Sequence, residues 1–210
     1  MGTKGFGKGI MGRLFGTGGQ QQLNGASSAQ EALKKDLSAP ISIMTKPFDP
    51  EGFLGKGWKT WKGPIKGSGL SGEEEIDPRS LNFFEIEIAK FIFETGLREG
   101  EESIPGEEKL RRLKDEKPGF IRFGGNVFLG LWQDYQASKE NSVIEWLYRD
   151  QKIGFMDFFG QILRNPTGTN QALCMFRRGN GNWRWDCYWL QNAWIASRPS
   201  VGCASQPKDF

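Results

Sequence analysis

Large apolar side chains at alternate positions near the end of the chain constrain its fold more than any other feature. The alternating positions are Trp183, Trp185, Cys187 and Trp189, with Arg184, Asp186 and Tyr188 between them. Alternate side chains of a β-strand point to opposite faces of its sheet. The segment is therefore predicted to be a strand with one aromatic face and a second face that carries a cation, an anion and a phenol.

The genetic code separates these two sets of positions. Trp is encoded only by TGG, and neither Cys codon contains adenine. Arg, Asp, Tyr, Ala, Ile and Ser can each be reached from the Asn codon AAC by changing its adenines alone. The dissimilar residues that fit this rule are Arg184, Asp186, Tyr188, Ala193, Ile195, Ser197 and Arg198. Asn180, Asn182 and Asn192 would be unchanged or fixed positions, and Gln191 requires another template codon or is constant.

From Phe176 to Gln206 the chain resembles the variable proteins of diversity-generating retroelements, with a weaker likeness over residues 76–170. In that family a reverse transcriptase copies a template repeat, mutates its adenines and rewrites the C-terminal end of a target gene. The resemblance implies a C-type-lectin-like fold that displays a variable region, about residues 176–206, to varied ligands, most of them proteins. It makes the seven residues reachable from AAC the ligand-binding set. Further candidates are Asn180, Asn182, Gln191 and Asn192.

Two alternatives compete with a variable display protein. We expect Trp183, Trp185, Trp189 and Trp194 to form a buried scaffold, because each can bury a large apolar area. A carbohydrate-binding module of fixed specificity would instead expose Trp185 and Trp189, and would use Asp186 and nearby Asn side chains to bind hydroxyl groups. An ordinary Trp-rich strand pair in a protein core is the other alternative. Exposure of Trp185 and Trp189 with burial of the residues between them would favour the carbohydrate-binding module.

The residue types present argue against an enzyme. The chain has no histidine, which excludes Ser-His-Asp and Cys-His catalysis and every His-ligated metal site. Its cysteines, Cys174, Cys187 and Cys203, lack the Cys-x-x-Cys spacing of zinc sites. An enzyme that uses Asp186 and Cys187 is a further competitor, but no second carboxylate lies near them in the sequence. We therefore expect no catalytic residues, no metal and no cofactor. A bridge between Cys187 and Cys203 would require an oxidising compartment.

Charge and composition divide the chain unevenly. Residues 1–70 contain ten Lys and Arg residues against four Asp and Glu, whereas residues 71–210 contain eighteen against twenty-one. Residues 1–40 are predicted to be a Gly-rich basic arm, through which the chain could form oligomers, and residues 41–210 a single domain. The basic and aromatic residues of 56–66 could bind nucleic acid, but docking aromatics with solvated lysines are the preferred interpretation, so no nucleic acid is expected.

No segment has the length or hydropathy of a membrane span or of a signal peptide. The default expectation is a cytoplasmic protein, and a destination on a virion or cell surface would need another export route.

The order of predicted elements favours an α+β fold with early helices, a small late antiparallel sheet and much irregular structure. Residues 40–71 are expected to be extended, with aromatic anchors. The predicted helices are Ala29–Leu37, one from Asp77 through Ile92, Glu107–Asp115, Phe128–Tyr135 and Ser142–Asp150. The predicted strands are Phe120–Phe123, Phe155–Leu163, Gln171–Phe176 and the Trp-rich segment.

Overall fold

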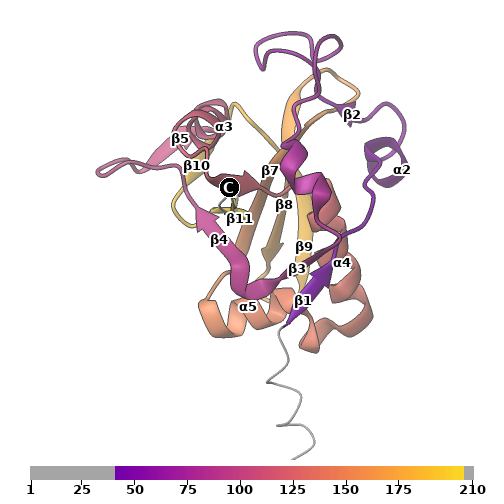
Figure 1. Ribbon diagram of the computed structural model, residues 1–210, viewed down its shortest axis with the longest axis vertical. Coiled ribbons are helices and arrows are strands. Elements are labelled where there is room, and N and C mark those ends of the chain that lie inside the picture. Colours follow the sequence, from indigo (N-terminus) through magenta and orange to yellow (C-terminus); the bar gives the residue numbers. More distant parts are fainter. Residues whose placement is uncertain (1–40, 206–210) are drawn as a thin grey trace, which may run out of the picture. The chain divides into compact units, whose positions relative to one another are not determined.

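A mixed β-sheet of seven strands organises the chain in this computed structural model, which describes residues 41–205 (Figure 1). Five strands form its main path in the order β4, β11, β7, β8 and β9. Their bounds are Phe91–Glu94, Ser200–Ala204, Phe155–Arg164, Asn170–Arg177 and Trp183–Trp189. Two further strands, β2 (Lys59–Thr60) and β6 (Phe120–Arg122), pair with β7 and β11. The predicted late strands are confirmed, and the protein combines helices with a sheet.

The prediction of a purely antiparallel sheet is wrong at one pair. β11 runs parallel to β7, with Ser200 opposite Asp157. The register between β7 and β8 also shifts between Phe158 and Ile162. Gly160 lies in this irregularity, where a Cβ would be 2.2 Å from the carbonyl oxygen of Arg122, so the close approach of the two backbones requires glycine.

Helices cover the two faces of the sheet separately. The helices α4 (Gly125–Ser138) and α5 (Val143–Gln151) pack on one face, here called the α4–α5 face. The helix α3 (Gly106–Asp115) packs on the opposite face, the α3 face, and Figure 1 shows it beside β5 and β10. A short 3₁₀ helix, η4 (Lys139–Asn141), joins α4 to α5. All three predicted helices in this region are confirmed.

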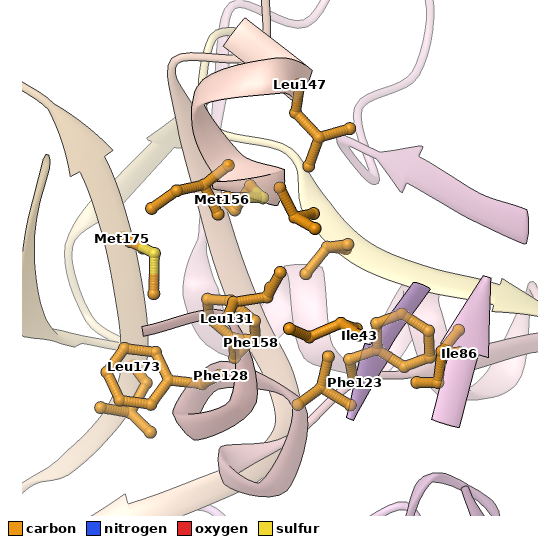
Figure 2. Close-up of a cluster of buried hydrophobic side chains, with 14 of the residues drawn as sticks. Ile43, Ile86, Phe123, Phe128, Leu131, Leu147, Met156, Phe158, Leu173 and Met175 are labelled. Atoms are coloured by element: carbon orange, nitrogen blue, oxygen red, sulfur yellow. The ribbon is translucent and has the colours of Figure 1, made fainter. Parts of the chain in front are cut away.

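Two hydrophobic clusters correspond to these two faces. The larger cluster lies on the α4–α5 face, where Phe128 of α4 meets Phe158 of β7 at a ring-centroid distance of 5.3 Å, and Leu173 and Met175 of β8 complete the contact (Figure 2). The smaller cluster lies on the α3 face. Its buried members are Trp61, Leu110, Leu113, Phe120, Phe159, Ile162, Ala172, Leu190 and Trp194. β7 and β8 are therefore buried on both sides over most of their length.

The predicted helix from Asp77 through Ile92 is wrong beyond its first turn. Asp77 does accept a hydrogen bond from the Arg79 N–H, as expected of an N-cap, but only a 3₁₀ helix, η2 (Pro78–Asn82), follows. The chain then forms β3 (Glu85–Glu87), the 3₁₀ helix η3 (Ile88–Lys90) and β4. Ile86 is buried between two exposed glutamates, which is the two-residue period of a strand.

The N-terminal part of the described chain is extended and held by aromatic anchors, as predicted. It contains β1 (Ser42–Met44), which pairs with β3, and the short helix α2 (Pro50–Leu54). Phe53 packs against the larger cluster, and Trp61 is buried in the smaller one. Residues 41–205 belong to one unit of the chain. The arm predicted for residues 1–40, with its helix Ala29–Leu37, lies outside the described residues.

Within residues 41–205, no helix combines the length and the apolar character needed to cross a membrane.

Candidate functional site

Strand β9 alternates as its sequence predicts. It is the last strand on its side of the main path and pairs only with β8 there, with Trp185 opposite Met175 and Asp186 opposite Cys174. Arg184 and Asp186 are exposed on the α3 face, and Trp183, Trp185 and Cys187 point to the α4–α5 face, where they contact the larger cluster. The strand thus presents dissimilar polar side chains on an aromatic backing.

Trp183 anchors the start of β9. Its side chain is 2% exposed, and its indole Nε1–H donates a hydrogen bond to Glu145 of α5 at 3.0 Å. Its backbone N–H donates to the hydroxyl of Tyr135 on α4. Arg177 forms an ion pair with the same Glu145 at 3.0 Å. Contacts with both helices therefore fix this end of the strand, as the scaffold prediction requires.

Burial of the Trp side chains decreases along β9. Trp185 is partly buried and packs against Phe53 at a ring-centroid distance of 5.0 Å. Trp189 is 49% exposed. The prediction that Trp189 belongs to a buried scaffold is therefore wrong. It lies opposite Gln171 at the end of the strand and is absent from both hydrophobic clusters.

A second short strand carries the other part of the site. β10 (Ala193–Ile195) pairs with β5 (Ser103–Pro105), placing Ile195 opposite Ser103. Ala193 and Ile195 are exposed, whereas Trp194 between them is 1% exposed. A Cβ at Gly106 would lie 2.3 Å from Trp194 Nε1, so the indole packs directly on the first turn of α3. Trp194 is therefore buried, as expected of a scaffold residue.

The seven predicted ligand-binding residues thus fall on β9, on β10 and in the segment that follows, and we call them the β9–β10 surface. They are Arg184, Asp186, Tyr188, Ala193, Ile195, Ser197 and Arg198. Five of them are exposed. Tyr188 and Arg198 are the two exceptions, because each is partly buried. The expectation that all seven stand free of the core is therefore wrong at these two positions.

Tyr188 and Arg198 pack on the scaffold and on each other. The Tyr188 ring meets Trp194 edge-on at 5.1 Å, and the Arg198 guanidinium carbon lies 3.7 Å from the Tyr188 ring centroid. The guanidinium also lies over Phe155 at 4.2 Å and over Trp194 at 4.6 Å. Cation–π contacts of this kind gain strength as water is excluded. These two side chains therefore contribute to stability as well as to the surface.

A buried ion pair lies beneath Arg198. Lys109 of α3 and Asp157 of β7 are both fully buried, and the Lys109 ammonium donates to Asp157 Oδ2 at 3.1 Å. The same ammonium donates to the carbonyl oxygen of Arg198 at 2.6 Å. Burial raises the pKa of the Asp157 carboxyl to about 7, although the positive charges of Lys109 and Arg198 act to lower it. No pattern in the sequence predicts this pair, and its one local signal is an Asp within the apolar run of β7.

The further candidates lie in turns. Asn180 and Asn182 belong to the hairpin between β8 and β9, where the Asn180 side chain accepts a hydrogen bond from the Asn182 N–H at 3.1 Å. Gln191 and Asn192 lie between β9 and β10, and the Asn192 N–H bonds to the Trp189 carbonyl. Asn180, Asn182 and Gln191 are exposed and Asn192 is partly buried, so they can extend the surface at its edges.

In residues 41–205, no group of three or more His, Cys, Asp or Glu side chains could hold a metal ion. All three cysteines are free, and burial raises the pKa of the Cys187 thiol to about 12. The exposed residues of the surface supply a cation, an anion, an aliphatic side chain and small groups.

No protein-family model, curated protein or solved structure matches the chain. A function for the β9–β10 surface must therefore be inferred from the geometry of the surface. The geometry separates exposed, dissimilar side chains from the buried Trp183 and Trp194 on the same two strands. At most positions, the exposed residues are those that can be reached from AAC and the buried ones are those encoded without adenine.

Proposed function

We propose that the chain is a ligand-binding display protein whose β9–β10 surface is diversified by adenine-directed retrotransfer. One observation carries the proposal. On β9 and β10, Arg184, Asp186, Ala193 and Ile195 are exposed, and each of these amino acids can be encoded by a codon reachable from AAC. The buried Trp183 and Trp194 have a codon without adenine. A mutator confined to adenines would thus change the surface and spare the anchors.

The surface supports a protein ligand better than a small molecule. Binding energy in protein interfaces is concentrated in a few large side chains, with Tyr and Arg enriched among them, surrounded by nearly neutral contacts. Arg184 and the partly exposed Tyr188 provide such side chains, and Ala193 and Ser197 provide small ones. The C-type-lectin-like architecture belongs to the same proposal, as a sheet that presents variable residues on a fixed scaffold.

The diversification is tested in DNA. We expect a near-copy of the segment that encodes residues 176–206 beside a reverse-transcriptase gene, differing from it only at adenines of the copy. A coding segment with no such copy in its genome would remove adenine-directed variation from the proposal. The binding surface would then require its own evidence.

The display function is tested by returning the five exposed positions to the template-like residue. A variant with Arg184→Asn, Asp186→Asn, Ala193→Asn, Ile195→Asn and Ser197→Asn should fold, because exposed substitutions usually cost within about 0.5 kcal/mol each. It should lose partners that the natural chain captures. A matched variant with Arg149→Asn, an exposed change on α5, should keep them. A quintuple variant that captures the same partners would contradict the proposal.

A carbohydrate-binding module remains the second candidate, because Trp189 is exposed and could stack on a sugar ring. Its partner in that alternative, Trp185, is partly buried against Phe53. Trp189→Ala should abolish glycan binding if this candidate is right, and should leave the capture of protein partners largely intact if the display proposal is right.

A further inference from the structure

Arg198 occupies a box made of three aromatic rings. Its guanidinium carbon lies 3.7 Å from the ring centroid of Tyr188, 4.2 Å from that of Phe155 and 4.6 Å from that of Trp194. The side chain is 13% exposed, so solvent reaches only a small part of it. Aromatic boxes of this kind bind cations through the negative faces of the rings.

The floor of the box is an acceptor that the buried ion pair leaves free. Lys109 uses Asp157 Oδ2, and Asp157 Oδ1 has no hydrogen-bond partner among residues 41–205. The Arg198 guanidinium lies near Oδ1, with Nη2 at 3.7 Å. Arg198 Nε is also buried without a partner in the described chain. The guanidinium therefore fills the box through its charge and shape, and without a direct hydrogen bond to the carboxylate.

Most of the box lies outside the residues predicted to vary. Phe155, Asp157 and Lys109 precede the variable region, and Trp194 has a codon without adenine. The group that fills the box, Arg198, belongs to the predicted variable set. Substitution at this one position would thus empty a box whose walls and floor stay in place, apart from Tyr188.

We propose that the box is a binding site for a guanidinium group, occupied by Arg198 in this chain and open to an arginine side chain of a protein ligand when residue 198 is small. That position 198 varies rests on the proposed function, whereas the box itself rests on the contacts above. With Arg198 present, its guanidinium fills the box, and the surface has no pocket there and suits a broad protein contact. A chain with Ala or Ser at 198 presents a pocket that selects ligands with a projecting arginine.

The test uses the full chain with Arg198→Ala and methylguanidinium chloride as the probe. A ligand that binds only the folded state stabilises it by about 1.4 kcal/mol at ten times its Kd. For a domain of this size each kcal/mol raises the melting temperature by about 2–4 °C, so a rise of about 3–6 °C is expected at ten times the Kd, increasing with the logarithm of the probe concentration above it. Urea, which has a similar planar shape without the charge, should give no rise.

Arg178→Ala is the matched control, because Arg178 is an exposed arginine in the β8–β9 hairpin outside the β9–β10 surface. Its melting temperature should respond to methylguanidinium as the natural chain does. An equal response of Arg198→Ala and Arg178→Ala would overturn the proposal, as would an equal response to urea and methylguanidinium.

If Arg198→Ala does not fold, Arg198→Gln keeps part of the side-chain stem and is tested in the same way. Rescue of either variant by methylguanidinium supports the box. Failure of both to fold with the probe present would overturn it, because position 198 would then not accept a smaller residue. If the variants fold but methylguanidinium does not raise their melting temperature, the box proposal is wrong. The display function would still stand, since it is tested separately by the quintuple variant.

Discussion

Trp194 and Trp189 provide a matched test of the scaffold. They have the same side chain, lie five positions apart and flank the turn between β9 and β10, yet Trp194 is 1% exposed and Trp189 is 49% exposed. Trp194→Ala should therefore cost much more stability than Trp189→Ala. The sequence pattern alone predicts equal costs, because it places both residues in the scaffold.

The expected magnitudes follow from the buried area. A fully buried aromatic side chain removes about 150–250 Å² from water, worth about 4–6 kcal/mol at about 25 cal/mol per Å². Such areas are upper bounds, and measured Trp→Ala losses are about 3–5 kcal/mol. Trp194 should reach the upper half of that range, because it also contacts Phe159 edge-on at 4.8 Å and lies beneath the cations of Lys109 and Arg198. About half of the Trp189 side chain is buried, so half of the measured range, about 1.5–2.5 kcal/mol, is expected there.

Urea unfolding followed by far-ultraviolet circular dichroism measures both losses, since this signal does not depend on the fluorescence of the mutated residue. The midpoint should fall for both variants while the slope stays constant, as for a change in stability alone. A loss at Trp189 equal to that at Trp194 would refute the separation of anchor from surface. A Trp194→Ala loss below about 1 kcal/mol would show that the indole is not packed as described.

Two further predictions concern buried titrating groups. Burial raises the pKa of the Asp157 carboxyl to about 7 from an ordinary value of 3.8. Between these two pH values the folded state therefore binds a proton that the unfolded state does not bind. Relative to Asp157→Asn, the free energy of unfolding should fall as pH rises from about 4 to about 7. A difference between the two chains that is flat or rises over this window, measured by urea unfolding, would contradict the raised pKa. Burial also raises the pKa of Cys203 to about 11 and that of Cys187 to about 12, so a thiol reagent at mildly alkaline pH should label the folded chain at least about 100-fold more slowly than the unfolded chain. In denaturant all three free cysteines should react, and fewer than three would indicate a disulfide.

Local patterns predicted the elements whose periodicity agrees with their tertiary contacts. The alternation at Trp183–Trp189 gave the correct strand, and the helix predicted at Glu107–Asp115 differs from α3 by one residue at its start. The segment from Asp77 to Ile92 failed for a physical reason. Its apolar residues fit a helical period, but Ile86 is buried through pairing of β3 with β1, which is more than forty positions away in the sequence. Tertiary pairing overrode a local preference.

The candidate site was predictable where exposure depends on the strand alone. Exposure of Arg184, Asp186, Ala193 and Ile195 follows from alternation on β9 and β10. The burial of Arg198 depends on Phe155 and Asp157, which reach it through the parallel pairing of β11 with β7. No local pattern contains that information. Trp189 fails for the complementary reason, because the strand extends beyond the side chains that cover Trp183 and Trp185.

The two anchors lie in separate hydrophobic clusters, which bears on how much variation the surface tolerates. Trp183 belongs to the cluster under α4 and α5, and Trp194 to the cluster under α3. Substitutions at exposed positions share no partner with either anchor, so their effects on stability should add. Positions 188 and 198 differ, because they share Trp194 and each other. If the surface is diversified, folding should restrict which residues occur together at these two positions, while the other five vary independently.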